Sequence, residues 1–393
     1  MFSNKTIADL KNASFIRAMF EQGNKLRQIY GDENVYDFSI GNPEVEPPEE
    51  VINAIREIAS SREDGTHRYM SNAGYLFVRN AIARKLSRSY EMEISAENIC
   101  MTCGAAAGLN VVFKSILNPG EEVIMFAPYF AEYKFYIGNA GGVPVIVETD
   151  KDFQIDAKAF ETAINSGTKA VLINSPNNPT GVIYRNQILE KMAHIIKEKE
   201  SEYGTDIIVV SDEPYNEIVF GTDRLPVVFR IFENAIVVNS YSKSLALPGE
   251  RIGYVAVSPK LKQNGLLMEA IVFNNRTLGF VNAPAIVQRI VAKAIDAAVD
   301  PGIYMERRDI LYNHLTSLGF ECQKPEGAFY LFVKSPVENE MDFVEAALRH
   351  NVLVVPGRGF GRPGYFRIAF CVGLDTIKGS LQAFDKIAKE YFS

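Results

Sequence analysis

Two ionisable residues stand directly after short apolar runs of this sequence. Asp212 follows IIVVS, and Lys243 follows AIVVNSYS. A lysine beside a buried strand loses hydration, which lowers its pKa and favours a nucleophilic free amine. A carboxylate at the end of a buried strand needs a cation or several hydrogen bonds. Taken singly, Lys243 is more often a solvated turn lysine and Asp212 a helix N-cap, so the neighbouring residues must decide.

Phosphate-binding groups surround Lys243. Ser240, Ser242 and Arg251 are donors that bind phosphate well. Upstream, CGAAAG at 103–108 begins where a predicted strand enters a helix, and small residues there let backbone N–H groups approach an anion. Such a helix start can also serve packing alone. Asn178 lies in NNPTG, a turn signal that can equally mark only a tight turn.

Three other patterns do not predict a function. Cys100 and Cys103 form C-x-x-C without a thioredoxin-like context, so we expect small buried residues. The glycines of 359–364 spell G-x-G-x-x-G, but YFRIAF follows and reads as a strand, which excludes nicotinamide binding by this motif. The four histidines lack metal-ligand spacing, and we expect no metal centre.

The middle of the chain alternates apolar runs with amphipathic segments. The predicted strands are Ile99–Cys103, Val123–Ala127, Val143–Val147, Ala170–Asn174, Ile207–Ser211, Ala235–Asn239 and Tyr254–Val257. This alternation predicts an α/β fold with a mostly parallel, seven-stranded sheet that helices cover on both faces. Ligands of such sheets bind beyond the carboxyl ends of the strands, where the polar residues above are found.

The two ends of the chain have a different pattern. Residues 1–43 show one helical segment and then an extended piece, DFSIGNP. From about 290 onward, helices at 285–299 and 302–318 are followed by short strands at 328–333, 352–355 and 365–369 and a C-terminal helix. We therefore expect a large domain at 44–289 and a smaller α+β domain built from 1–43 and 290–393.

Composition limits the class of protein. The 393 residues are 47% hydrophobic and 23% charged, which is typical of globular proteins and excludes a disordered or fibrous chain. The net charge of −7 does not favour nucleic-acid binding. The N-terminal residues show no signal-peptide pattern, and we find no stretch that predicts a membrane span. With only four cysteines, a cytoplasmic location is expected.

The ordered set of Asn178, Asp212 with Tyr215, Lys243, Arg251 and Arg367 resembles the class I/II aminotransferases. These are pyridoxal-phosphate enzymes of fold type I, similar to aspartate aminotransferase. The matching strings are SPNNPTG, SDEPY, SYSKSLALPGERIGY, PEGAFY, FRIAF and, in Y-x-x-x-x-G-x-x-x-x-R form, YMSNAGYLFVR. The resemblance extends from about residue 34 to the C-terminus.

The resemblance implies roles at the reacting centre. Lys243 would form a Schiff base with the cofactor aldehyde and, once displaced by the substrate amine, would move a proton. Asp212 would pair with the pyridine nitrogen, so that the ring acts as an electron sink. Tyr215 and Asn178 would bind the ring hydroxyl oxygen.

The resemblance also implies how the phosphate of the cofactor is held. Arg251 and Ser240 would bind it together with backbone groups of Ala105 and Ala106, and Ser242 is a further candidate. CGAAAG lacks the hydroxyl or lysine that many relatives have in this loop. More of the phosphate binding should therefore fall on backbone N–H groups.

Two further contacts follow from the same comparison. Arg367 would bind the substrate α-carboxylate as a bidentate fork, in a site that Gly41 and Asn178 also line. Phe130 takes the place of the aromatic residue that stacks on the cofactor ring, often Trp or Tyr in relatives. Tyr129 and Tyr133 are alternatives for this position.

Relatives form homodimers that share their active sites. Tyr69 would reach the phosphate in the neighbouring subunit. Arg276 lies roughly where dicarboxylate-specific relatives have an arginine from the neighbour, although a surface arginine is an equal alternative. If Arg276 does read a distal carboxylate, aspartate or glutamate would be the favoured donor.

The sequence thus predicts a transaminase that moves an amino group from an amino acid to a 2-oxo acid, with 2-oxoglutarate as the expected acceptor. Other pyridoxal-phosphate enzymes share these residues, namely β-lyases, decarboxylases and cyclopropane-forming synthases. A cofactor-binding regulator without turnover is a further alternative. The segment before residue 34 is too short for the DNA-reading module that such a regulator would need.

Overall fold

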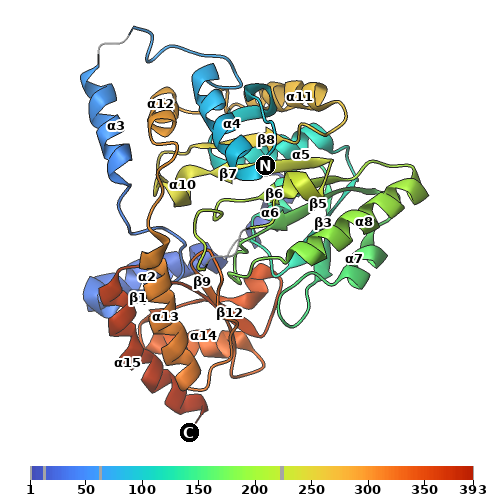
Figure 1. Cartoon of the computed structure of the whole chain (residues 1–393). Coiled ribbons are helices and arrows are strands. Elements are labelled where there is room, and N and C mark those ends of the chain that lie inside the picture. The colour runs from blue at the N-terminus through green and yellow to red at the C-terminus, as the bar shows by residue number, and fades with distance from the viewer. Residues whose placement is uncertain (1, 12–14, 62–63, 222–224, 393) are drawn as a thin grey trace.

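The structure is a computed structural model of the chain, and it describes residues 2–11, 15–61, 64–221 and 225–392. A large sheet with its helices forms one body, and a smaller sheet with the two chain ends forms another beside it (Figure 1).

The large sheet contains the seven predicted strands in the order β2-β8-β7-β6-β5-β3-β4. Their bounds are β2 Ile99–Thr102, β3 Glu122–Ala127, β4 Val143–Glu148, β5 Thr168–Asn174, β6 Ile208–Asp212, β7 Ala235–Ser240 and β8 Gly253–Val257. Six strands run parallel, and β8 runs antiparallel to both of its neighbours, β2 and β7. The prediction of a mostly parallel seven-stranded sheet is confirmed.

Successive side chains of the central strands enter two different cores, because side chains of a strand alternate between the faces of its sheet. In β6, Val209 packs in one core and Val210 in the other. In β7, Val237 and Val238 divide in the same way. Both faces are therefore buried, which explains why these strands read as continuous apolar runs.

Helices cover the two faces of the large sheet. One face packs against α3 Glu49–Ser60, α4 Leu76–Tyr90, α7 Ala157–Ala163, α8 Asn186–Tyr203, α9 Val228–Ile231 and α12 Ala285–Lys293. The other packs against α5 Gly104–Ile116, α6 Tyr133–Asn139 and α11 Asn264–Thr277. The short helix α10 Tyr241–Ser244 follows β7 directly.

The smaller body has its own core and two small sheets. Strands β11 Val355–Pro356, β12 Tyr365–Ala369 and β9 Tyr330–Lys334 form an antiparallel sheet, and β1 Tyr36–Asp37 pairs in parallel with β10 Val352–Leu353. Its helices are α13 Pro301–Ser317, α14 Glu340–Arg349 and α15 Leu374–Tyr391. Segments from both ends of the chain thus share one core.

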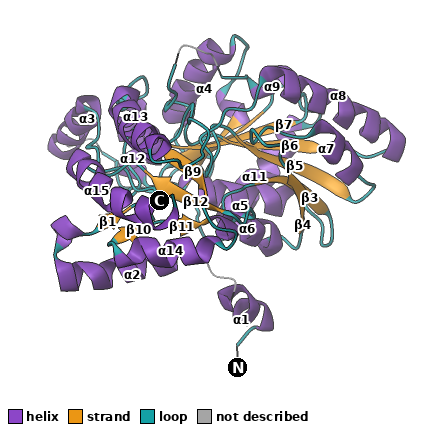
Figure 2. Ribbon diagram, turned by 90° about the horizontal axis from the view of Figure 1, so that it is seen from below, coloured by secondary structure: helices purple, strands orange, loops and turns teal. Residues whose placement is uncertain are grey.

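Some elements differ from the sequence prediction. The described part of residues 1–43 contains two α-helices, α1 Asn4–Lys11 and α2 Phe15–Tyr30, instead of one, and α1 projects from the rest of the molecule (Figure 2). Helix α12 ends at Lys293, before the predicted 299. The predicted strand at 352–355 is divided between β10 and β11, because Val352 pairs with β1 whereas Val355 pairs with β12.

The glycine-rich run at 359–364 leads into β12 and not into a helix, as its sequence predicts. Three 3-10 helices complete the described elements, η1 Asp32–Asn34, η2 Ala96–Asn98 and η3 Gly357–Phe360. Cys100 is buried as predicted, whereas Cys103 is only partly buried.

Candidate active site

A pocket of about 300 Å³ lies at the carboxyl ends of the large-sheet strands, facing the smaller body. Twelve of the fourteen residues predicted for the site line it, namely Gly41, Ala105, Ala106, Phe130, Asn178, Asp212, Tyr215, Ser240, Ser242, Lys243, Arg251 and Arg367. The segments that follow β2, β3, β5, β6 and β7 all reach this pocket, because parallel strands end at the same edge of the sheet.

Lys243 lies on α10, the single helical turn that follows β7. Its Nζ donates a hydrogen bond of 2.5 Å to the backbone oxygen of Gly41 and lies 5.3 Å from the centre of the Phe329 ring. Burial lowers the pKa of Lys243 to about 8, with smaller contributions from neighbouring charges. An amine with this pKa is partly neutral near pH 7 and can act as a nucleophile or base.

Asp212 is the last residue of β6 and is buried. The hydroxyl of Tyr133 donates a 2.6 Å hydrogen bond to its Oδ2, whereas its Oδ1 is buried without a partner among the described residues. Burial raises the pKa of Asp212 to about 7, and the hydrogen bond from Tyr133 opposes that shift. One carboxylate oxygen therefore remains available to a donor or cation inside the pocket.

Asn174 orients two residues of the site. It ends β5 and lies opposite Asp212 in the pairing of β5 with β6. Its amide nitrogen donates to the backbone oxygen of Asp212 at 2.9 Å, and its Oδ1 accepts from the backbone nitrogen of Asn178 at 2.8 Å. The NNPTG turn is thereby fixed against the end of the neighbouring strand.

Arg367 enters the pocket from β12 of the smaller body and is only 1% exposed. Its Nη1 donates to Oδ1 of Asn178 at 3.0 Å, and its Nη2 donates to the backbone oxygen of Ser39 at 2.6 Å. The rings of Tyr330 and Phe360 lie 4.6 and 4.8 Å from the guanidinium carbon. Neither hydrogen-bond acceptor is charged, so a buried cation faces the pocket, and burial lowers its pKa.

Tyr215 follows β6 and lies beside the smaller body. Its hydroxyl is 2.9 Å from that of Tyr330, and either can donate. Burial raises the pKa of Tyr215 well above its ordinary value, and that of Tyr330 to about 12. Both hydroxyls therefore keep their protons at neutral pH.

The beginning of α5 forms one end of the pocket. Ala105 and Ala106 lie in its first turn, after Gly104, which has a φ of 82°. A Cβ at Gly104 would lie 2.7 Å from Nη2 of Arg251. Nη1 of Arg251 bonds the hydroxyl of Ser242 at 3.5 Å. A helix N-terminus, a guanidinium and hydroxyls are groups that favour an anion, and here they lie together.

Phe130 and one of its two predicted alternatives, Tyr133, both line the pocket. The ring of Tyr133 meets that of Phe130 edge-on, with the ring centres 5.5 Å apart, while its hydroxyl holds Asp212. Tyr129 does not line the pocket and packs beneath Gly361.

Tyr69 and Arg276 do not line the pocket of their own chain. Tyr69 is 92% exposed, and Arg276 lies in a separate hollow with Phe273, whose ring is 5.5 Å from the guanidinium carbon. This placement agrees with side chains that serve a neighbouring subunit, which stays a prediction.

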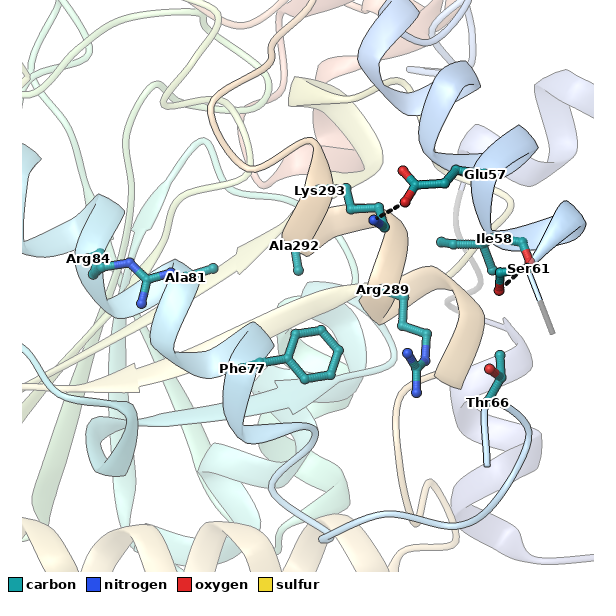
Figure 3. A pocket seen from close by; sticks show the side chains of 10 residues that line it. All are labelled: Glu57, Ile58, Ser61, Thr66, Phe77, Ala81, Arg84, Arg289, Ala292 and Lys293. Carbon is teal, nitrogen blue, oxygen red and sulfur yellow. Dashed lines mark hydrogen bonds and ion pairs between the residues drawn. The ribbon is translucent and has the colours of Figure 1, made fainter. Parts of the chain in front are cut away.

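A further hollow, of about 450 Å³, lies between α3, α4 and α12 (Figure 3). There Nζ of Lys293 bonds Glu57 at 2.7 Å, and the guanidinium of Arg289 lies over the rings of Tyr75 and Phe77. None of the fourteen predicted residues lines this hollow, so it is not the candidate active site.

Two residues that contact the predicted groups were not assigned these contacts by the sequence. Tyr133 was expected only as an alternative ring-stacking residue, and Tyr330 was only part of the PEGAFY string. Neither contact has a sequence signal, since each depends on packing between distant segments. Within the described residues, no cluster of His, Cys, Asp and Glu could hold a metal ion, and no helix meets the length and apolarity required to cross a bilayer.

Comparison with known proteins adds independent evidence. The family model described as aminotransferase class I and II matches residues 33–383. The chain is 31% identical over 355 residues to the aspartate aminotransferase of Thermotoga maritima, which covers 89% of this chain and 90% of the relative. A solved amino transferase from Eubacterium rectale superposes over 100% of both chains with a TM-score of 0.96 and 42% identity. The aspartate aminotransferase of Thermus thermophilus with maleate gives a TM-score of 0.86 and 29% identity, with 95% and 97% coverage.

Proposed function

The chain belongs to the class I and II aminotransferases, and from this we propose that it transfers an amino group from an amino acid to 2-oxoglutarate, using pyridoxal phosphate attached to Lys243 through a Schiff base. One observation carries this proposal. A lysine whose pKa is lowered shares a 300 Å³ pocket with a buried carboxylate and a buried guanidinium. An amine, a charge for the ring nitrogen and a carboxylate receptor are the groups that this reaction requires.

The pocket residues fit pyridoxal phosphate. The unpartnered Oδ1 of Asp212 suits a protonated ring nitrogen, which would satisfy its buried charge. Tyr215 and Asn178 would bind the ring hydroxyl oxygen, and Phe130 would lie against the ring face. When bound, the cofactor supplies the electron sink that stabilises negative charge developing on the substrate.

The phosphate would occupy the end of the pocket formed by α5. Backbone N–H groups of Ala105 and Ala106, the hydroxyls of Ser240 and Ser242, and the guanidinium of Arg251 would hold it. The absence of a side chain at Gly104 leaves room for the guanidinium of Arg251, since a Cβ there would lie 2.7 Å from its Nη2.

The substrate would be oriented by its α-carboxylate. Arg367 would bind that group, close to Gly41 and Asn178, and its contacts with the rings of Tyr330 and Phe360 help to keep the guanidinium in place. Lys243, once released by the incoming amine, would remove the proton from the substrate α-carbon through Nζ. Its lowered pKa keeps a fraction of the amine neutral for this task.

A homodimer is part of the proposal. The loop around Tyr69 is joined to the α11 region by the Nδ2 of Asn72, which bonds the backbone oxygen of Val281 at 3.2 Å. The segments 69–77 and 266–286 carry several exposed large apolar side chains, namely Tyr69, Leu76, Phe77, Leu266, Phe273, Leu278 and Ile286. Exposed apolar side chains that lie together are typical of an interface. We further propose domain bounds of 44–289 for the large domain and 1–43 with 290–393 for the small one.

An activity panel tests the function. Purified protein loaded with pyridoxal phosphate is incubated with single amino acids, in the presence and absence of 2-oxoglutarate. Glutamate should form only when the oxo acid is present, and the donor that works best names the substrate. Lys243→Ala should abolish turnover and the absorbance of the lysine-bound cofactor while the fold remains intact.

The same panel separates the alternative reactions. Pyruvate and ammonia without the oxo acid would indicate a β-lyase, and carbon dioxide would indicate a decarboxylase. Either result in place of glutamate would refute transamination. Turnover that persists in Lys243→Ala would refute only the assignment of Lys243 as the nucleophile.

A further inference from the structure

Tyr330 contacts two residues of the candidate active site, Arg367 and Tyr215. It lies in β9 of the smaller body and is 2% exposed. Its ring covers the guanidinium of Arg367 at 4.6 Å, and its hydroxyl is 2.9 Å from that of Tyr215. Tyr215 follows β6 of the large sheet and packs in the core of the smaller body, so the side chain of Tyr330 connects Arg367 with the segment that follows β6.

The position of the Tyr330 hydroxyl is restricted by the backbone. A Cβ at Gly41 would meet Oη of Tyr330 at a distance of 2.1 Å, far inside van der Waals contact. The backbone oxygen of the same glycine accepts the hydrogen bond from Lys243. The hydroxyl is therefore confined between Tyr215 and the chain segment that contacts the lysine.

We propose that Tyr330 is a positioning residue that acts through two neighbours: its hydroxyl strengthens Tyr215 as a donor, and its ring holds Arg367 in the orientation that receives a carboxylate. The inference rests on the proposed function, because it assigns Tyr215 to the ring oxygen of the cofactor. It adds a residue that couples the cofactor end of the pocket to the carboxylate end.

The direction of the hydrogen bond follows from proton counting. A hydroxyl has a single proton, and Tyr215 would use its proton to donate to the ring oxygen. At the contact between the two tyrosines, Tyr330 must then be the donor. Donation to Tyr215 polarises its O–H group and makes it a stronger donor in turn.

The consequence is measurable in the holoenzyme. In the bound cofactor the ring oxygen would carry more negative charge when the lysine-linked nitrogen is unprotonated, so a stronger donor at Tyr215 would favour the deprotonated form. In Tyr330→Phe the ring remains but Tyr215 loses its polarising partner. We expect the midpoint of the pH-dependent absorbance change of the bound cofactor to move upward by roughly half a pH unit.

The ring contact has a separate test. Tyr330→Leu removes the aromatic face beneath Arg367 as well as the hydroxyl. A lost cation–π contact should raise KM for the amino-acid donor by roughly three- to thirty-fold. Tyr330→Phe should leave KM near the wild-type value, so the two variants separate the two contacts.

Tyr304→Phe is the matched control. Tyr304 is fully buried, packs against Phe329 at 5.4 Å, and its hydroxyl has no hydrogen-bond partner among the described residues. Loss of that hydroxyl should change neither the absorbance midpoint nor KM. Circular dichroism of each cofactor-free variant shows whether the fold is retained.

The outcomes are distinguishable. An unchanged midpoint in Tyr330→Phe, or an equal shift in Tyr304→Phe, would overturn the role of the hydroxyl. An unchanged KM in Tyr330→Leu would overturn the role of the ring. If the wild-type protein showed no absorbance from a lysine-bound cofactor, the proposed function itself would fail, and this inference with it.

Discussion

At the scale of single residues, Arg367 is a buried cation whose two acceptors are both neutral, the amide of Asn178 and the backbone of Ser39. A buried charge of this kind is stabilised by a bidentate carboxylate. Lysine offers only a point charge. Arg367→Lys should therefore raise KM for amino acid and oxo acid by roughly ten- to a hundred-fold, with a smaller effect on kcat.

The control for this variant is Arg358→Lys. Arg358 bonds the buried carboxylate of Glu340 at 2.8 Å but does not line the pocket. It should leave KM unchanged in a steady-state assay. An Arg367→Lys enzyme with wild-type kcat/KM would remove Arg367 from the carboxylate site.

We predict that the carboxylate of Asp212 supports activity but lowers the stability of the cofactor-free protein. Its pKa is raised to about 7 in the folded protein, against about 3.9 in an unfolded chain. The folded state thus binds the proton more tightly, and the cofactor-free protein loses stability as pH rises from about 4 to 7. Asp212→Asn resembles the protonated form, so this cofactor-free variant should exceed the wild type in free energy of unfolding at pH 8 by on the order of a few kcal/mol.

Urea unfolding at pH 5 and pH 8 tests this sign, since the difference between the two proteins should shrink at the lower pH. Glu213→Gln is the matched variant, because burial raises the pKa of Glu213 to about 7 as well, but Glu213 faces Tyr90 outside the pocket. It should share the stability effect without the loss of kcat expected for Asp212→Asn. A stability difference that grows as pH falls would contradict the assignment.

The sequence predicts the chemical groups of this site better than their contacts. Lys243, Asp212 and Arg251 stand in local strings, and the structure brings them to one pocket. The contact of Tyr133 with Asp212 and that of Tyr330 with Tyr215 were not predicted, because the two residues of each pair are 79 and 115 positions apart in the sequence. Only packing of the folded chain brings such tyrosines together, and their surroundings in sequence carry no signal of it.

At the scale of elements, the large sheet was predictable and the smaller body was less so. Strands buried on both faces are continuous apolar runs, and all seven were identified within a residue or two at each end. The run at 352–355 is also apolar throughout, but it pairs first with β1 and then with β12. Hydrophobicity indicates that a strand is buried and does not indicate which partner it pairs with.

The beginning of α5 provides a test at this scale. Gly104→Ala would place a Cβ 2.7 Å from Arg251 at a residue with positive φ. We expect displacement of the guanidinium and a roughly ten-fold or greater loss of affinity for pyridoxal phosphate. Titration of the cofactor-free protein with pyridoxal phosphate, followed by absorbance at equilibrium, measures this affinity.

Gly120→Ala separates backbone strain from the contact with Arg251. Gly120 has a similar φ of 89°, but nothing lies within 4 Å of an added Cβ. Its substitution should cost about 1 kcal/mol in unfolding free energy and leave cofactor affinity unchanged. Equal affinity losses in both variants would argue against an anion site at α5.

At the scale of the whole molecule, the proposed dimer predicts complementation between two inactive chains. Lys243→Ala lacks the amine but still presents Tyr69 to its neighbour, whereas Tyr69→Ala retains the amine. In a mixed dimer, Lys243 of one subunit and Tyr69 of the other form one complete site. Co-expression with random pairing should restore about a quarter of the wild-type activity per site.

Light scattering provides the companion measurement, with an expected mass of twice the 43.8 kDa of the chain. Each variant expressed alone sets the baseline. Mixed dimers no more active than that baseline would show that Tyr69 does not act across an interface.

The lysine and the carboxylate-binding arginine each bond a main-chain oxygen from the same short segment, that of Gly41 and that of Ser39. A main-chain oxygen survives almost any exchange of its own side chain. Replacing Ser39 by alanine would remove the 2.6 Å hydrogen bond from its hydroxyl to Asp37, but it would leave the main-chain contact with Arg367 intact, so a scan of side chains would not report that contact. Its contribution becomes visible only when the path of the chain itself is altered, for example by shortening the loop by one residue.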